Sequence, residues 1–406
     1  MIPVIRAFLP VATKTIPRFD LADYVEQPWK AGMARKRVFS QGQLNSIYEE
    51  VWMSQLLITG GAGFIGSHTC LELLNAGHDL LVLDDFSNSS PIAIDKVAEL
   101  AELDTSTSKE RLRLHQGDIR NQDCLEALFK DAAEQGRPIE AVIHFAGLKA
   151  VGESVREPLR YWDVNVCGSW SLLKTMNAHG CHTLVFSSSA TLYGLPDLVP
   201  IPESAKVQPI NPYGHSKAAV EQLLTDLSAS APNTWRIASL RYFNPVGAHP
   251  SGRIGEDPLG IPNNLFPFVS QVAIGKRERL QVFGDDWPTP DGTGVRDYIH
   301  VMDLAEGHRA ALDCLFSEAP QHLTVNLGSG KGASVLDVVK AFEAASGRSV
   351  PYELVARRPG DAAITVADPS MAAQRFGWRT KRSLADICRD GWAWQSANPC
   401  GYKQEV

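Results

Sequence analysis

The segment Gln55-Leu-Leu-Ile-Thr-Gly-Gly-Ala-Gly-Phe-Ile-Gly66 predicts how the chain folds. Its apolar first half suits a buried strand of a parallel sheet, and a helical leucine pattern follows its glycines. Gly60, Gly63 and Gly66 allow a tight turn, a close approach of the backbone to pyrophosphate, and close packing of helix on strand. The amides at the helix N-terminus favour a bound phosphate. The segment therefore predicts the first βαβ unit of a dinucleotide-binding domain.

A second strand, Leu80-Leu-Val-Leu-Asp84, ends in a carboxylate at about the separation expected of the group that holds the adenosine ribose hydroxyls. Because this carboxylate would repel a 2′-phosphate, the sequence favours NAD over NADP. Strand patterns recur over 111–115 and 140–147, and helical patterns over 121–135, 165–179 and 213–230. The alternation predicts an α/β fold with a Rossmann-like, doubly wound parallel sheet.

Tyr213 and Lys217 are four positions apart, so they share one face of a helix. A phenol is normally too weak an acid to serve as a base at neutral pH, but a neighbouring ammonium lowers its pKa. Tyr213 is therefore a candidate general base, with Lys217 tuning its pKa. The apolar strand pattern at 184–186 runs into a serine-rich stretch that includes Ser189, where open α/β sheets bind ligands. Together these groups predict hydride abstraction from a carbinol. His144 is predicted to be a packed strand residue.

Composition excludes several classes of protein. The 406 residues are 44% hydrophobic and 21% charged, with a formal net charge of -7, so the chain has no electrostatic footprint for nucleic acid. No uninterrupted apolar run reaches the ~18 residues of a membrane span. The seven cysteines include no C-x-x-C pair, which predicts reduced thiols in a cytoplasmic protein and no zinc or other metal site.

The chain divides into three parts by pattern. Residues 1–52 contain several prolines and no clear periodicity, which predicts a disordered tail, or upstream sequence joined to a true start at Met53. Residues 53–240 are the expected NAD-binding domain, with later strands or helices returning to it, and residues 241–406 the expected smaller substrate lobe. In that lobe Arg296 and a second basic point at Arg357-Arg358 suit a diphosphate.

The chain from about Ser54 to Tyr402 resembles the UDP-glucose 4-epimerases, a branch of the extended short-chain dehydrogenases/reductases. The resemblance extends over both expected lobes. The matching segments are Thr59–His68 (TGGAGFIGSH), Val142–Val155 (VIHFAGLKAVGESV), Phe186–Ala190 (FSSSA), Arg241–Pro250 (RYFNPVGAHP), Ile261–Leu265 (IPNNL) and Asp291–Leu304 (DGTGVRDYIHVMDL).

The resemblance implies roles for individual residues. Tyr213 matches the base, Lys217 the lysine that binds the nicotinamide ribose, and Ser189 the hydroxyl that contacts the sugar. Val164 departs from the pattern, since some members carry a cofactor-contacting Asn there, but Asn165 is retained. Besides Tyr213 and Lys217, the implied NAD positions are Gly60, Gly63, Phe64, Ile65, Gly66, Asp84, Asp85, Asn88, Ser89, Asp118, Ile119, Phe145, Ala146, Lys149 and Phe243. Besides Ser189, the implied UDP-sugar positions are Asn244, Asn264, Leu265, Phe283, Arg296, Arg358, Asp361 and Thr365.

The implied activity is a redox isomerisation in galactose metabolism, in which tightly bound NAD takes a hydride from C4 and returns it to the other face of a 4-ketosugar. Two alternatives stay open. A nucleotide-sugar 4,6-dehydratase shares the fold but resembles Thr-Asp-Glu at the strand end, where this chain has Ser189-Ala190-Thr191. A non-enzymatic NAD-sensing regulator would keep the glycine loop without needing Ser189, Tyr213 and Lys217 together.

Two finer expectations follow from the resemblance. Members restricted to glucose and galactose carry a tyrosine where this chain has Thr365, and members that also accept N-acetyl sugars carry a small residue. The chain is therefore expected to turn over UDP-N-acetylglucosamine and UDP-N-acetylgalactosamine as well. It is also expected to form a homodimer, in which the helices over 121–135 and 165–179 pair across a two-fold axis.

Overall fold

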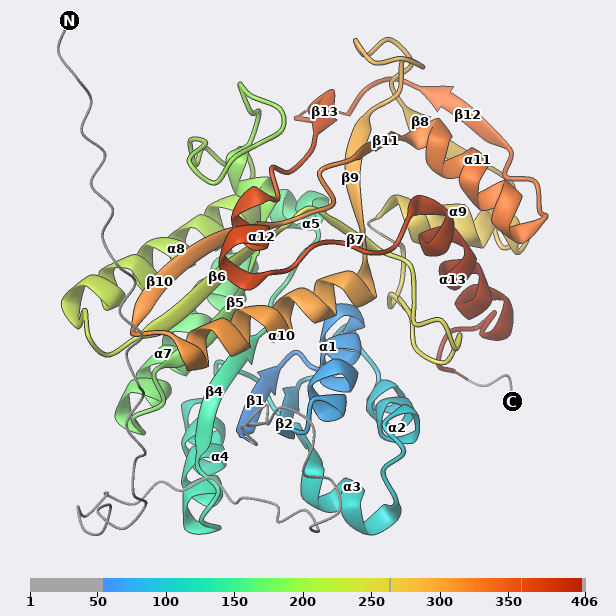
Figure 1. Ribbon diagram of the computed structural model, residues 1–406. Helices are drawn as coiled ribbons and strands as arrows, with labels where there is room; N and C mark the ends of the chain where they lie inside the picture. Colours follow the sequence, from blue (N-terminus) through green and yellow to red (C-terminus); the bar gives the residue numbers. More distant parts are fainter. Residues whose placement is uncertain (1–53, 263, 359, 404–406) are drawn as a thin grey trace, which may run out of the picture. The chain divides into compact units, whose positions relative to one another are not determined.

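The computed structural model describes residues 54–403 except residues 263 and 359. The tail predicted over residues 1–52 lies outside the described residues. Seven parallel strands form one sheet in the order β10-β6-β5-β4-β1-β2-β3 (Figure 1). The strand order reverses between β1 and β4, which is where such sheets bind ligands. The strands are β1 (Gln55–Thr59), β2 (Asp79–Asp84), β3 (Leu112–Gln116), β4 (Ile139–His144), β5 (Thr183–Ser189), β6 (Arg236–Tyr242) and β10 (Gln321–Leu327).

Helices cover both faces of this sheet, and the alternation of side chains along β1 shows why. Leu56 and Ile58 pack on one face with α1, α2, α10 and α12, whereas Leu57 packs on the other with α4, α7 and α8. The predicted doubly wound architecture is confirmed. The helices are α1 (Phe64–Asn75), α2 (Pro91–Leu100), α4 (Gln122–Glu134), α7 (Gly168–Ala178), α8 (Pro212–Ser230), α10 (Val301–Ser317) and α12 (Ser370–Phe376).

The observed elements differ from the sequence patterns mainly at their ends. The helix expected over 165–179 begins as the π-helical segment η1 (Trp162–Cys167) and continues as α7. Strand β10 comes from the C-terminal half of the chain, yet it pairs with β6 in the large sheet. The division at residue 240 remains a prediction. Short connecting helices are α3 (Thr105–Arg111), α5 (Val151–Arg156), α6 (Pro158–Tyr161) and η2 (Ala190–Tyr193).

A second set of elements builds the smaller lobe. In it β7, β9, β11 and β13 form one sheet, and β8 pairs with β12. Its core contains Phe266, Val269, Phe342 and Ile387 from the three covering helices. The elements are β7 (Asn244–Val246), β8 (Leu280–Phe283), β9 (Val295–His300), β11 (Gly332–Ser334), β12 (Tyr352–Val355), β13 (Ile364–Thr365), α9 (Leu265–Ala273), α11 (Val335–Ser346) and α13 (Leu384–Ala397).

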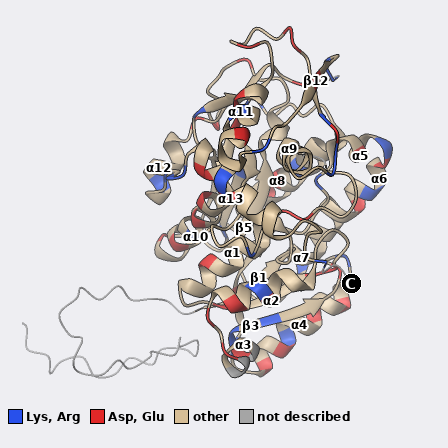
Figure 2. Cartoon of the chain, turned by 90° about the vertical axis from the view of Figure 1, so that its right-hand side faces the viewer, with Lys and Arg blue, Asp and Glu red and all other residues tan. Residues whose placement is uncertain are grey.

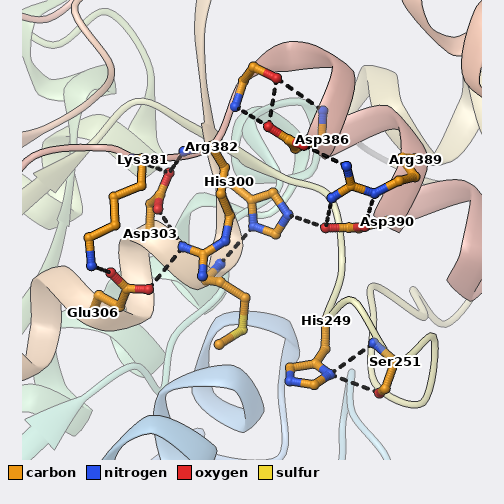
Figure 3. Close-up of polar contacts among 12 residues, drawn as sticks. His249, Ser251, His300, Asp303, Glu306, Lys381, Arg382, Asp386, Arg389 and Asp390 are labelled. Atoms are coloured by element: carbon orange, nitrogen blue, oxygen red, sulfur yellow. Dashed lines mark hydrogen bonds and ion pairs between the residues drawn. The ribbon is translucent and has the colours of Figure 1, made fainter.

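A buried histidine ties β9 to helices of both sets (Figure 3). His300 ends β9 and caps α10, because its Nδ1 accepts a hydrogen bond from the Met302 amide at 3.0 Å. Its Nε2–H therefore donates to the Asp390 carboxylate on α13, at 3.2 Å. The exposed Arg389 guanidinium donates to both oxygens of the same carboxylate. These bonds fix the strand whose other end carries Arg296.

The surface features of the described residues agree with the composition. Figure 2 shows Lys and Arg interspersed with Asp and Glu, without a face of one sign in that view. No helix among the described residues has the length and apolar character needed to cross a bilayer. His144 is buried between the Thr59 hydroxyl, 2.7 Å from Nδ1, and the Ser169 hydroxyl, 2.9 Å from Nε2. Burial lowers its pKa to about 3, so its prediction as a packed strand residue is confirmed.

A buried ion pair supports the carboxyl end of β5. The Glu221 carboxylate on α8 accepts hydrogen bonds from Arg241 on β6, at 3.0 and 2.6 Å, and from the Ser188 hydroxyl. Arg241 also donates to the Tyr193 hydroxyl at 3.0 Å. Both charged side chains are almost fully buried. Removing one charge would leave the other desolvated and unpaired.

We predict that Glu221→Gln lowers the free energy of unfolding by about 3–5 kcal/mol, because Arg241 stays buried without a counter-charge. The matched control is Glu134→Gln, which removes one partner of the exposed Lys130–Glu134 pair and should change stability by less than about 1 kcal/mol. Urea denaturation of both variants measures the difference. Equal effects of the two substitutions would contradict this account of the Glu221 site.

Candidate active site

One large cavity, of about 1150 Å³, lies at the carboxyl ends of the central strands and extends to the smaller lobe. Its lining combines the glycine loop after β1, the end of β5, the first turns of α8, and parts of β8 and β9. All the residues predicted above as catalytic, cofactor-binding or substrate-binding line this cavity except Arg357 and Thr365. The structure therefore brings together side chains that are spread over some 300 positions between Gly60 and Asp361.

The glycine loop presents a thin backbone to the cavity. Gly60 has φ +70°, and a Cβ there would lie 2.6 Å from the Ala146 amide nitrogen at the end of the neighbouring strand. A Cβ on Gly66 would overlap the Gly60 carbonyl oxygen. Only glycine therefore allows this turn together with its close contacts to α1 and to β4. The resulting cradle, at the N-terminus of α1, suits a pyrophosphate.

Asp84 closes β2 beside that cradle. Its carboxylate accepts hydrogen bonds from the Ala62 amide at 2.9 Å, from the Phe86 amide at 3.0 Å and from the Ser89 hydroxyl at 2.6 Å. Burial raises its pKa, and these hydrogen bonds act in the opposite direction. The carboxylate is therefore held at the loop, where it fits a ribose diol and opposes a 2′-phosphate. The residues present thus fit NAD.

Lys217 is anchored at the end of β5. Its Nζ donates to the Ser187 carbonyl at 2.8 Å and lies 4.9 Å from the centre of the Phe186 ring. Burial lowers the pKa of Lys217 to about 8, with Glu221 acting in the opposite direction. Because α8 carries both residues, this anchor also places Tyr213 at the mouth of the serine-rich strand end.

Tyr213 differs from the sequence expectation in one respect. Burial raises its pKa, and a hydrogen bond with Ser189 only partly offsets that increase. The prediction that Lys217 lowers the Tyr213 pKa is wrong for the protein alone, because the ammonium points to the Ser187 carbonyl instead. The Ser189 hydroxyl also donates to Thr191 at 2.9 Å. Tyr213 and Ser189 therefore form the polar centre of the cavity.

Asn165 supports this centre from behind, a role that its sequence position did not reveal. Its amide bonds both backbone groups of Leu148, at 2.7 and 3.0 Å, and donates to the Ser216 hydroxyl at 3.0 Å. It thereby fixes the backbone at Leu148, between Gly147, which lies next to Lys217, and Lys149. Val164 lines the cavity without offering a polar group.

Tyr242 and His308 form a buried hydrogen-bonded pair that the sequence did not predict. His308 Nδ1–H donates to the Leu304 carbonyl at 2.8 Å, so its Nε2 accepts the hydrogen bond from the Tyr242 hydroxyl. Burial lowers the pKa of His308 to about 4 and therefore keeps the ring neutral. No local pattern could have signalled this pair, because the two residues are 66 positions apart.

The far end of the cavity is basic and aromatic. Arg296 is half-buried on β9, and burial lowers its pKa, with a further lowering by the nearby Arg358. Arg358 stacks on Phe283 at 4.7 Å and pairs with Asp361 at 3.0 Å. Two guanidinium groups that face one cavity attract a doubly charged anion such as a diphosphate.

Two predicted site residues do not line the cavity. Arg357 pairs with Asp286 and stacks on Trp287 instead. Thr365 is the other. It lies on β13, in register with Arg296 of β9, and is half-buried. It does not line the cavity. Its partner in the sheet, Arg296, does line the cavity, so Thr365 lies beside a residue of the cavity wall.

Comparison with known proteins agrees with this geometry. The family model described as GDP-mannose 4,6 dehydratase, which covers extended short-chain dehydrogenases/reductases, matches residues 57–391. The UDP-glucose 4-epimerase of Bacillus subtilis is 53% identical over 86% of this chain and 98% of its own length.

Two solved structures extend the comparison. The UDP-glucose 4-epimerase of Bifidobacterium longum, in complex with NAD+ and UDP, has 46% identity and a TM-score of 0.80, and the match covers 86% of this chain and 100% of that one. The UDP-Glc/GlcNAc 4-epimerase of Campylobacter jejuni has 35% identity and a TM-score of 0.72, over 85% of this chain and 99% of that one. With its glycine cradle, its Tyr213–Lys217 pair and these relatives, the chain belongs to the NAD-dependent UDP-glucose 4-epimerase family.

Proposed function

We propose that this chain interconverts UDP-glucose and UDP-galactose by oxidising and reducing C4 of the sugar. The observation that carries the proposal is that Ser189, Tyr213 and the two arginines Arg296 and Arg358 line the same cavity as the NAD cradle. The arginines would hold the diphosphate, and Asn244, Asn264 and Phe283 would surround the rest of the UDP. The cradle at Gly60, Gly63 and Gly66 would hold NAD, with Asp84 at the adenosine ribose.

Bound NAD would supply a hydride acceptor that later returns the same hydride. Tyr213 takes the proton from the 4-hydroxyl as C4 loses its hydride, and Ser189 donates a hydrogen bond to the developing 4-ketosugar. Lys217, a cation below its pKa of about 8, would hold the nicotinamide ribose, the role that the resemblance implies for it. The sugar would then turn about its phosphate linkage. Tyr213 would return the proton to the 4-oxygen, and the hydride would return from the reduced cofactor to the other face of C4.

Anchoring at the diphosphate suits this mechanism. Arg296 and Arg358 lie at the opposite end of the cavity from the glycine loop, so binding energy would come mainly from the UDP. A loosely held sugar is free to turn. The strand end Ser189-Ala190-Thr191 offers no carboxylic acid, so it lacks the catalyst that removal of water from C5 and C6 would need. This favours epimerisation over the 4,6-dehydratase alternative.

A wider substrate range is the second part of the proposal. Thr365 is smaller than the tyrosine expected in members restricted to glucose and galactose. It lies beside Arg296, so a small residue there would leave space next to the cavity wall for an acetamido group. The name of the Campylobacter jejuni relative gives both Glc and GlcNAc as its sugars.

We also propose a homodimer. Exposed apolar side chains gather on α5, α6, η1 and α7, where Leu159 is 84% exposed, Val155 62% and Trp170 53%. Among the described residues none of the exposed large apolar side chains lies on α4. We therefore centre the interface on α6 to α7 rather than on the predicted pair of helices over 121–135 and 165–179. The free thiols among the described cysteines support a cytoplasmic location.

Tyr213→Phe tests the catalytic assignment. The substitution removes the ionisable oxygen but keeps the ring, so epimerisation of UDP-galactose without added cofactor should fall by about 10³-fold or more while NAD stays bound. Product separation after incubation measures the rate, and the NAD content of the protein is the control. A variant that retains a tenth of the parent activity would show that Tyr213 is not the base.

Lys217→Met tests the buried ammonium through stability. In protein stripped of NAD, the folded-state pKa of Lys217 is about 8 and its ordinary value is 10.5, so between these values only the unfolded chain holds this proton. The difference in the free energy of unfolding, parent minus variant, should therefore increase by on the order of 1 kcal/mol per pH unit as the pH rises between these two values. Below about pH 8 the difference should be flat. Parallel urea titrations at several pH values measure it, and a constant difference across the window would contradict the lowered pKa.

Thr365→Tyr tests the substrate range. The parent should interconvert UDP-N-acetylglucosamine and UDP-N-acetylgalactosamine, and the variant should lose that activity while it keeps UDP-galactose turnover within about threefold. Kinetic measurements on both substrates decide the matter. Absence of N-acetyl turnover by the parent at saturating substrate would overturn the proposal.

Trp170→Glu tests the proposed interface. A charge in place of an exposed indole on α7 should convert a dimer into a monomer. Leu354→Glu, at a similarly exposed apolar position on β12, is the matched control and should leave the dimer intact. Light scattering after size-exclusion chromatography gives the masses. A monomeric parent, or a dimeric Trp170→Glu variant, would contradict the assignment.

A further inference from the structure

Residues 255–261, here called the strap, join the NAD side of the cavity to its UDP side. The strap lies between β7 and α9 in the chain, and most of its residues line the cavity. It is anchored to the C-terminal segment, because the Tyr402 amide donates to Asp257 at 2.9 Å and the Trp394 indole donates to the Glu256 carbonyl at 3.3 Å. The C-terminal segment therefore holds the strap through the Asp257 side chain and the Glu256 carbonyl.

Glu256 contacts both halves of the cavity through one oxygen. Its Oε1 accepts a hydrogen bond from Lys149 Nζ at 3.1 Å and another from Asn264 Nδ2 at 3.1 Å. The Glu256 side chain is only 10% exposed. Lys149 follows β4 and is assigned to NAD, whereas Asn264 directly precedes α9 and is assigned to UDP. One carboxylate oxygen thus positions a residue of each ligand's site.

A second bond attaches the strap to the NAD side. The Leu259 amide donates to Asn88 Oδ1 at 3.2 Å. Asn88 follows β2 and directly precedes Ser89, whose hydroxyl donates to the Asp84 carboxylate. The strap therefore reaches two of the predicted NAD positions, Asn88 and Lys149, and one predicted UDP position, Asn264. These contacts lie far from Tyr213 in sequence and take no part in the proton transfer proposed above.

We propose that Glu256 is a positioning residue that couples binding of the UDP moiety to retention of NAD. The inference rests on the proposed function, because it takes the NAD and UDP sites as assigned there. UDP that engages Asn264 and Leu265 fixes the start of α9, which keeps the Asn264 amide on Glu256. The same carboxylate then holds Lys149 and the strap beside the NAD cleft. Because linkage is reciprocal, UDP slows the release of NAD and bound NAD strengthens the binding of UDP.

The experiment measures NAD release with and without UDP. Holoprotein is mixed with an excess of isotopically labelled NAD, and exchange is followed by rapid filtration. In the parent, saturating UDP should slow exchange by about fivefold or more. Glu256→Gln keeps an acceptor for Asn264 but loses the charge that pairs with Lys149, so exchange should be faster and the effect of UDP should fall below about twofold.

The matched control is Glu99→Gln. Glu99 lies on α2 and pairs with Arg253, just ahead of the strap, so this variant also removes an ion pair between that loop and the NAD side. Both partners are exposed and neither lines the cavity. It should keep the full effect of UDP. If Glu256→Gln does not hold NAD through purification, Glu256→Asp is measured in its place, with the same loss expected because its carboxylate is one methylene shorter.

Three outcomes would overturn the inference: no effect of UDP on exchange in the parent, an undiminished effect in the Glu256 variant, or an equal loss in Glu99→Gln. Epimerisation of UDP-galactose by the parent is assayed in parallel. A parent that epimerises while UDP leaves NAD exchange unchanged would lose only the coupling. A parent that cannot epimerise would lose the proposed function itself.

Discussion

The hydrogen bond from the Lys217 ammonium to the Ser187 carbonyl is the contact on which the site depends. It joins the first turns of α8 to the carboxyl end of β5, so it sets where Tyr213 meets Ser189. Burial of this cation is unfavourable, as the lowering of its pKa to about 8 shows. The nearby Glu221–Arg241 pair and the Asn165 amide hold the surrounding backbone in place. The reactive residues are thus positioned by rigid elements rather than by loops.

The two ends of the cavity differ in charge, and this difference organises the proposed binding. At one end the Asp84 carboxylate and the glycine backbone suit a diol and a pyrophosphate. At the other end Arg296 and Arg358 suit a second diphosphate. The groups that would act on the sugar lie between them and are few. A site that binds its ligand firmly at the diphosphate and loosely at the sugar allows the intermediate to turn.

Sequence alone predicted features that depend on local spacing. The glycine loop, Asp84 and the Tyr213–Lys217 pair each lie within one or two adjacent elements, so chain geometry fixes them. Contacts between distant segments could not be predicted in this way. Glu256 reaches Lys149 across 107 positions and Tyr242 reaches His308 across 66, and neither pair has a local signature. The raised pKa of Tyr213 was mispredicted because its burial, and the turn of the Lys217 ammonium to the Ser187 carbonyl, are properties of the folded chain. The position of Thr365, beside Arg296 and outside the cavity lining, likewise depends on the pairing of β13 with β9.

The central claim is that C4 loses a hydride and regains the same one inside a single active site. UDP-galactose that carries deuterium at C4 tests this most directly, in ordinary water and without added NAD. The account predicts UDP-glucose that retains the deuterium at C4, as mass spectrometry and NMR of the product would show. Loss of the label to solvent, or formation of a 4-keto-6-deoxy sugar in place of the epimer, would contradict it.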